Sequence, residues 1–95
     1  MTEDWRAAAY RLLEAARGLQ GDLRTALIYF LEEVSVGDLR AAQDLMKRGV
    51  TDPAAVIERL VEMGLVERGR DCLNLAAPLR RMLSERGLEA LVRAL

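Results

Sequence analysis

The sequence TDPAAVIERLVEMGLVERGRDCLNLA, residues 51–76, decides the fold of this 95-residue chain. Asp52 precedes Pro53, and this pair favours a helix that Asp52 caps and Pro53 opens. Apolar residues then recur three and four positions apart, until Gly64 supplies a left-handed stop. The first half of the stretch therefore predicts an amphipathic helix over residues 52–63.

After this helix the apolar pattern changes from the helical period to alternation. Two short runs flank the turn-forming triplet Gly69-Arg70-Asp71, which predicts a β-hairpin over residues 65–76. The residues ERLVEMGLVERGRD, with the helix before them, resemble the recognition helix and wing of winged helix-turn-helix proteins. The resemblance is greatest to transcription regulators of the multiple-antibiotic-resistance type. It implies a winged helix-turn-helix core over residues 22–76.

Two further helices are predicted on the N-terminal side of the core. Thr2 is a suitable cap for an N-terminal helix over residues 2–18, whose apolar stripe contains Trp5. This tryptophan either joins the core or anchors an interface. Asp22 is a suitable cap for the next helix, which ends near residue 33.

The segment that precedes the turn of the helix-turn-helix predicts a third core helix. Ser35-Val36-Gly37-Asp38 resembles a capping box with aspartate in place of glutamate, so this helix is expected to begin near Val36. Its spacing places Leu39 and Met46 among the inward-facing side chains. Val34, just before it, is expected to pair with the hairpin as a short third strand.

The C-terminal segment, residues 77–95, predicts one helix or two, opened by Pro78 and ended or kinked at Gly87. Its last apolar stripe, which includes Leu88 and Leu91, needs a covering surface. The first helix of the same subunit is one such surface, and a second copy of the chain is the other. We favour a homodimer formed through the terminal helices. The fold class expected is mainly α with a small β-hairpin wing, a single winged helix-turn-helix domain over residues 1–95 with additional N- and C-terminal helices.

Composition argues against several classes of function. The chain has no histidine, one cysteine and no glycine-rich phosphate loop, so we expect no enzyme activity, no metal and no cofactor. Cys72 alternates with apolar neighbours, which is typical of a small buried residue. No apolar run is long enough to cross a bilayer, and the N-terminus lacks the pattern of a secretory signal, so no membrane partner and a cytoplasmic location are expected.

The resemblance implies sequence-specific binding of double-stranded DNA, and hence a transcription regulator. The helix over residues 52–63 would enter the major groove, and the wing over 65–76 would contact the backbone. The sequence does not indicate whether a small-molecule effector exists. The residues expected to contact DNA are Lys47, Arg48, Thr51, Asp52, Ala55, Glu58, Arg59, Glu62, Arg68 and Arg70.

The charge of the outward helix face favours an alternative, a winged-helix module that binds protein and not DNA. Asp52, Glu58 and Glu62 stand against the single cation Arg59, and the whole chain has a net charge of −1. Such a face opposes the phosphate attraction on which DNA affinity depends. Basic side chains clustered with Arg59 on one surface would favour DNA. Dispersed or neutralised basic side chains would favour a protein partner. A third interpretation is that these arginines form only a solvated face, paired with Glu67, Asp71 and Asp44.

Overall fold

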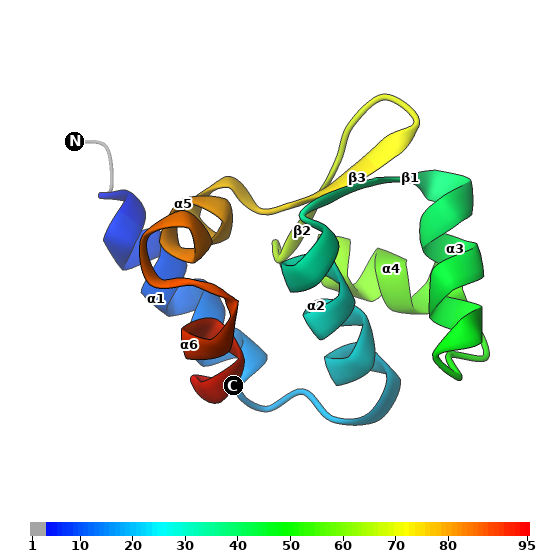
Figure 1. The fold of residues 1–95 in the computed structure, drawn as a ribbon, viewed down its shortest axis with the longest axis horizontal. Helices are drawn as coiled ribbons and strands as arrows, with labels where there is room; N and C mark the ends of the chain where they lie inside the picture. Colours follow the sequence, from blue (N-terminus) through cyan, green and yellow to red (C-terminus); the bar gives the residue numbers. More distant parts are fainter. Residues whose placement is uncertain (1–3) are drawn as a thin grey trace.

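The computed structural model describes residues 4–95 and is mainly helical with a small antiparallel sheet (Figure 1). Thr2, the expected cap of the first helix, lies outside the described residues. Within the described range no helix is long and apolar enough to span a membrane. The elements, in chain order, are α1 (Trp5–Ala16), α2 (Gly21–Glu33), β1 (Ser35–Gly37), α3 (Asp38–Lys47), α4 (Pro53–Glu62), β2 (Val66–Arg68), β3 (Cys72–Leu75), α5 (Ala77–Arg86) and α6 (Leu88–Arg93).

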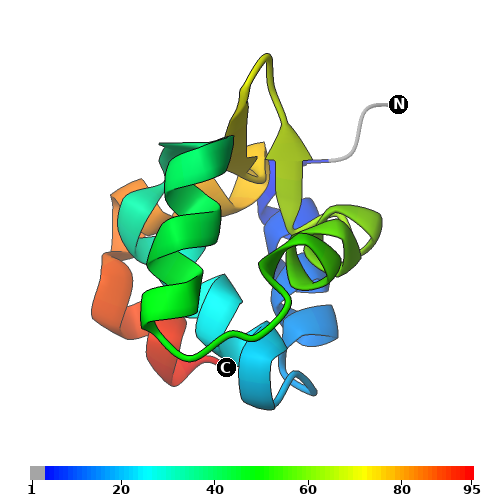
Figure 2. The ribbon, with the colours of Figure 1, turned by 90° about the vertical axis from the view of Figure 1, so that its right-hand side faces the viewer.

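The helix and hairpin predicted from residues 51–76 are confirmed as α4, β2 and β3. Asp52 caps α4, because its Oδ1 accepts a hydrogen bond from the Ala55 N–H at 3.2 Å. Gly64 ends the helical segment with a φ of 76°, a conformation that glycine adopts without the strain of a Cβ atom. The hairpin rises above α3 and α4 (Figure 2). The fold is thus a winged helix-turn-helix arrangement with extra helices at both ends.

The sheet has a third strand, in the order β1-β3-β2, but this strand begins one residue later than expected. Val34 lies outside the assigned strand, with a φ of 66° at the end of α2, but it does pair with the hairpin, because its carbonyl accepts a hydrogen bond from the Leu75 N–H of β3 at 2.7 Å. The capping-box prediction is also wrong. Ser35 lies in β1, where its Oγ donates a 2.6 Å hydrogen bond to Asn74 Oδ1. Gly37 is the residue that precedes α3. Pairing with β3 keeps residues 35–37 extended, so the helix starts at Asp38.

The core draws apolar side chains from all six helices and all three strands of the described range, and it corrects the expected inner face of α3. Ala41 and Leu45 are the buried residues of this helix. Leu39 and Met46 are 79% and 62% exposed, so the prediction that they point inward is wrong. The physical reason is that α3 packs against α2 and α4 through the side that carries Ala41 and Leu45, one helical turn apart, and Leu39 and Met46 lie outside that side. An apolar surface is therefore left on the outer side of α3.

The terminal helices pack on the core of their own chain. Gly87, with a φ of 87°, separates α5 from α6, as the sequence predicts. Leu91 is buried, and α6 contacts α5 and α2. Arg17, just after α1, donates a hydrogen bond from Nε to the Ala94 carbonyl at 3.2 Å. The same chain thus covers much of the terminal stripe. That stripe therefore does not require a second copy of the chain to cover it, and the homodimer stays a prediction.

Candidate functional site

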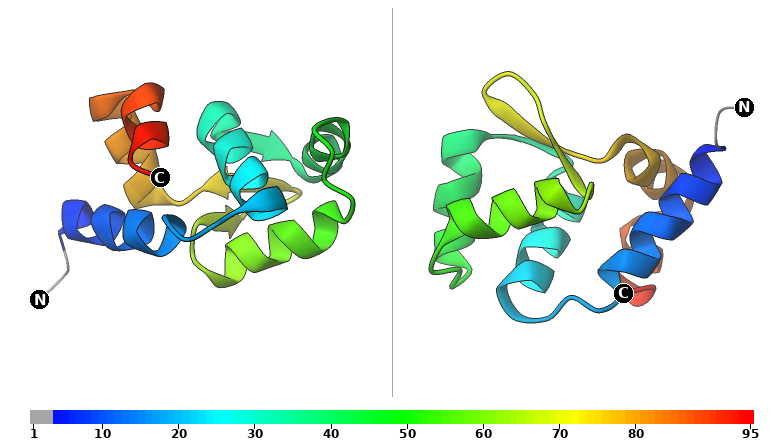
Figure 3. Two further views of the ribbon diagram at one scale, coloured as in Figure 1. Left: turned by 90° about the horizontal axis from the view of Figure 1, so that it is seen from below. Right: turned by 180° about the vertical axis from the view of Figure 1, so that it is seen from behind.

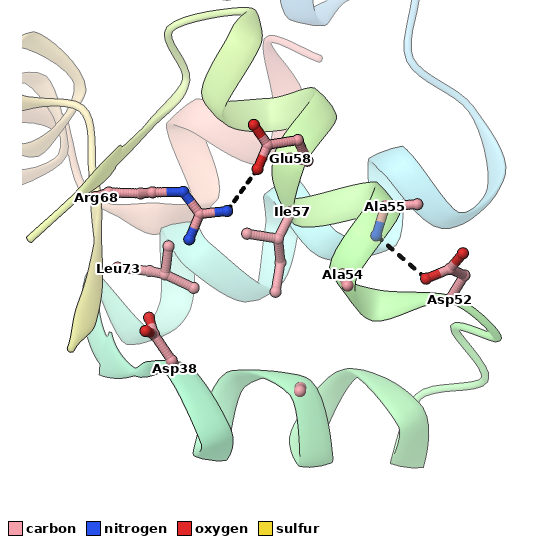
Figure 4. A pocket seen from close by; sticks show the side chains of 9 residues that line it. Asp38, Asp52, Ala54, Ala55, Ile57, Glu58, Arg68 and Leu73 are labelled. Carbon is pink, nitrogen blue, oxygen red and sulfur yellow. Dashed lines mark hydrogen bonds and ion pairs between the residues drawn. The ribbon is translucent and has the colours of Figure 1, made fainter.

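An open groove of about 540 Å³ lies between α3, α4 and the hairpin (Figure 4). It is called the α3–α4 groove below. The residues that line it are Asp38, Ala42, Asp52, Ala54, Ala55, Ile57, Glu58, Arg68 and Leu73.

The shape of the α3–α4 groove follows from side-chain size. Ile57 of α4 and Leu73 of β3 are buried and make an apolar floor. Ala42 on α3 and Ala54 and Ala55 on α4 line the walls. Because alanine carries only a methyl group, the two helices leave open space where larger side chains would meet. The groove is therefore suited to an apolar side chain supplied from outside.

The rim of the groove is acidic. Asp38 stands at the start of α3 and Asp52 at the start of α4, both exposed, and neither forms an ion pair with any described residue. Glu58 also lies on the rim. Its Oε2 accepts a 2.6 Å hydrogen bond from Arg68 Nη2, which neutralises the Glu58 carboxylate. Three carboxylates thus face one guanidinium around an apolar floor. This arrangement attracts positive charge and repels phosphate.

The arginines expected to contact DNA are mostly engaged with carboxylates. Arg59 Nη1 lies 3.4 Å from Glu62 Oε2, Arg68 pairs with Glu58, and Arg48 Nη2 lies 2.7 Å from Glu32 Oε1. Arg48 also covers the ring of Tyr29, at 5.0 Å from its centroid. Within residues 4–95, Lys47 and Arg70 have no ion pair. Three of the five cations expected to contact DNA are therefore neutralised. Such neutralisation is the feature expected of a protein-binding face.

The carboxylates that neutralise these arginines are not the expected ones. Glu67 Oε2 lies 3.7 Å from Arg80 Nη1, and Asp44 Oδ2 lies 3.4 Å from Arg40 Nε. Asp44 also accepts a 2.6 Å hydrogen bond from the Tyr29 hydroxyl. Burial, followed by this hydrogen bond and the nearby charge of Asp44, raises the pKa of Tyr29 well above its usual range. Tyr29 therefore stays protonated and ties α2 to α3.

The residues expected to contact DNA are divided between two clefts and exposed positions outside them. The α3–α4 groove brings together four of them: Asp52, Ala55, Glu58 and Arg68. Lys47 and Arg48 line another cleft of about 450 Å³, together with Tyr29, Glu32, Glu33 and Asp44. The remaining four, Thr51, Arg59, Glu62 and Arg70, are exposed but line neither of these two clefts.

Sequence reasoning missed Asp38, Ala42, Ala54, Ile57 and Leu73 as lining residues. The signal available for the α3 wall was the spacing of Asp38 and Ala42, which places them one turn apart on one helix face. No pattern within α3 alone could place that wall opposite α4. In the described part of the chain, no three of its cysteine, aspartate and glutamate residues are grouped so as to hold a metal ion.

Comparison with known proteins bears on the core and not on the terminal helices. No curated protein matches the chain. The model of the family described as PolB1 Binding Protein 2 matches residues 20–81. This range begins just before α2, ends within α5 and contains the whole α3–α4 groove. It covers well over half of the chain, and the chain therefore belongs to the PolB1 Binding Protein 2 family.

Proposed function

We propose that this chain is a protein-binding accessory module that docks on a PolB1 polymerase through the α3–α4 groove. The family description names PolB1 as what its members bind. The observation that carries the proposal is the apolar groove with an acidic rim, set where a DNA-binding winged helix would present cations. The docking surface extends onto Leu39 of α3, which is 79% exposed one turn from Ala42.

The chemistry of the groove specifies the segment of the polymerase that it accepts. The buried side chains of Ile57 and Leu73 offer an apolar floor, and Asp38 and Asp52 leave negative charge at the rim. A short basic segment that carries one large apolar side chain satisfies both features. The apolar side chain would supply most of the affinity, and the charges would supply orientation and a faster encounter.

Sequence-specific DNA binding, as in transcription regulators of the multiple-antibiotic-resistance type, is the competing function. An exposed ion pair is worth only about 0.2–1 kcal/mol, so the pairs of Arg59 and Arg68 alone would not prevent contact with phosphates. Their partners Glu62 and Glu58 nevertheless remain on the same face. A phosphate backbone would meet those carboxylates at close range, which lowers the affinity for DNA. Protein docking has no such conflict.

A groove-filling variant tests the proposal. Ala54→Trp would occupy the groove, because Ala54 lies on the side of α4 that faces α3 (Figure 4). Ala15→Trp, at an exposed site on α1, introduces the same side chain far from the groove. Each variant and the parent chain would be titrated by calorimetry against a purified PolB1 polymerase. We expect the parent and Ala15→Trp to bind equally and Ala54→Trp to bind at least ~10-fold more weakly, since an anchor pocket contributes about 1.5 kcal/mol or more.

A titration against duplex DNA completes the test. Equal polymerase binding by both tryptophan variants would refute docking in the groove. Absence of polymerase binding, together with DNA binding that Ala54→Trp abolishes, would establish the competing function.

A further inference from the structure

A second surface, made by α1 and α5, brings arginines and aromatic residues together. The two helices cross and pack against each other (Figure 3). Their packing brings together Trp5, Arg6 and Tyr10 of α1 with Arg81 and Arg86 of α5. These five residues are called the α1–α5 arginine surface.

Aromatic rings position the guanidinium groups of this surface. The Cζ atoms of Arg6 and Arg81 lie 4.6 and 4.7 Å from the centroid of the Trp5 ring. Arg86 lies over the ring of Tyr10 at 5.5 Å, and its Nη2 donates a 2.5 Å hydrogen bond to the Tyr10 hydroxyl. A ring attracts a guanidinium through its negative face and leaves the N–H groups at the guanidinium edge available. The side chains of Arg81 and Arg86 are thus ordered without being neutralised by any carboxylate of the described residues.

This differs from the arginines around the α3–α4 groove, which are paired with carboxylates. Among residues 4–95, no carboxylate pairs with Arg81 or Arg86. Arg6 forms an ion pair with Glu85, in which Nη2 lies 3.7 Å from Oε1 and both side chains are about half exposed. Ring-held arginines lose little conformational freedom when they bind a ligand, since they are already ordered. The α1–α5 arginine surface is therefore prepared for an anion with several oxygen atoms.

We infer that the α1–α5 arginine surface binds the phosphate backbone of duplex DNA without reading its sequence. A guanidinium fork matches the geometry of phosphate oxygens, and a duplex presents phosphates closely enough for a few cations to suffice. Guanidinium groups already cover the Trp5 and Tyr10 rings, so base stacking contributes nothing here. The contact is with the backbone alone, and its affinity is modest and falls with salt.

The position of this surface leaves the α3–α4 groove free. In Figure 1, α1 and α5 lie at one end of the long axis, which extends 38 Å, and α3 lies at the other end. A polymerase segment in the groove and a duplex on the α1–α5 arginine surface can therefore be bound together. The inference concerns the isolated chain and does not rest on docking of the polymerase.

The test measures binding of a fluorescein-labelled mixed-sequence DNA duplex by anisotropy over a series of salt concentrations. The test variant is the double change Arg81→Ala with Arg86→Ala. The matched control, Arg40→Ala with Arg93→Ala, removes the same charge from exposed sites that belong to neither proposed binding surface. We expect the full chain to bind at low salt with a Kd below about 100 μM, the weak end of non-specific binding.

The test variant is expected to bind at least ~10-fold more weakly at low salt. The slope of its plot of log K against log salt concentration should be less negative by about 2, which corresponds to two lost phosphate contacts. The control is expected to keep the parent slope. Absence of DNA binding by the parent at low salt would overturn the inference, as would equal losses in the two variants. A test variant that binds DNA normally but the polymerase more weakly would also overturn it, and would assign the surface to protein contact.

Discussion

The substitution Leu39→Ala separates a docking residue from a folding residue on a single helix. Leu39 is 79% exposed, so little of its side chain stabilises the free chain. Full burial of a leucine side chain is worth about 1.5–3 kcal/mol, and the exposed four-fifths therefore leaves about 1.2–2.4 kcal/mol to be gained in the complex. The expected loss on substitution is a roughly 10–50-fold weaker affinity for the polymerase.

The stability of the free Leu39→Ala variant should barely change. Leucine and alanine have similar helix propensities, and exposed substitutions usually alter the free energy of unfolding by less than about 0.5 kcal/mol. Leu45, fully buried on the same helix, provides the contrast, because Leu45→Ala should lower this free energy by about 2–5 kcal/mol. Urea unfolding and calorimetric titration measure the two quantities. Unchanged polymerase affinity in Leu39→Ala, or a loss of stability as large as that of Leu45→Ala, would refute the reasoning.

Three further substitutions test the charges and the buried hydroxyl. Arg68→Ala releases Glu58 and makes the groove more acidic, so polymerase affinity measured at low salt should hold or rise, whereas a role in DNA contact requires a fall in DNA affinity. Asp52→Asn keeps a good helix cap but removes a rim charge, and should slow polymerase association about 2- to 5-fold at low salt in stopped-flow experiments, with stability nearly unchanged. Tyr29→Phe removes a hydrogen bond to a charged group and should lower the free energy of unfolding by about 1.5–3 kcal/mol near neutral pH. Because the pKa of Tyr29 is raised in the folded chain, its contribution is fully present below pH ~10 and is lost as the pH rises further, so urea midpoints of parent and variant should converge in strong alkali; a constant difference would contradict this linkage.

Local rules were sufficient for the organising stretch and insufficient for α3. The cap at Asp52 and the stop at Gly64 depend on backbone preferences of single residues, which do not require knowledge of the partner elements. The inner face of α3 depends instead on the shape left by α2 and α4. Leu39 looks like a core residue by spacing, yet Ala41 and Leu45 take that role. The spacing of apolar residues alone does not determine which of two apolar faces of a helix is buried.

The candidate site was partly predictable for the same reason. The acidic character of the outward α4 face follows from helix geometry and was visible in the sequence. The pairing of Arg68 with Glu58 joins the wing to α4, and that of Arg48 with Glu32 joins the end of α3 to α2. Such contacts are set by tertiary packing, so the choice among several nearby carboxylates could not be made from sequence. The α1–α5 arginine surface likewise requires Tyr10 to meet Arg86 across the fold.

Hydrogen exchange of the 95-residue chain, measured by mass spectrometry with and without a PolB1 polymerase, tests the docking proposal most directly. Peptides from α3, α4 and the hairpin, which surround the α3–α4 groove, should exchange more slowly in the complex. Peptides from α6, which lies outside the groove, should exchange at the same rate in both samples. Protection confined to α1, α5 and α6, or no protection anywhere at saturating polymerase, would contradict docking through the groove.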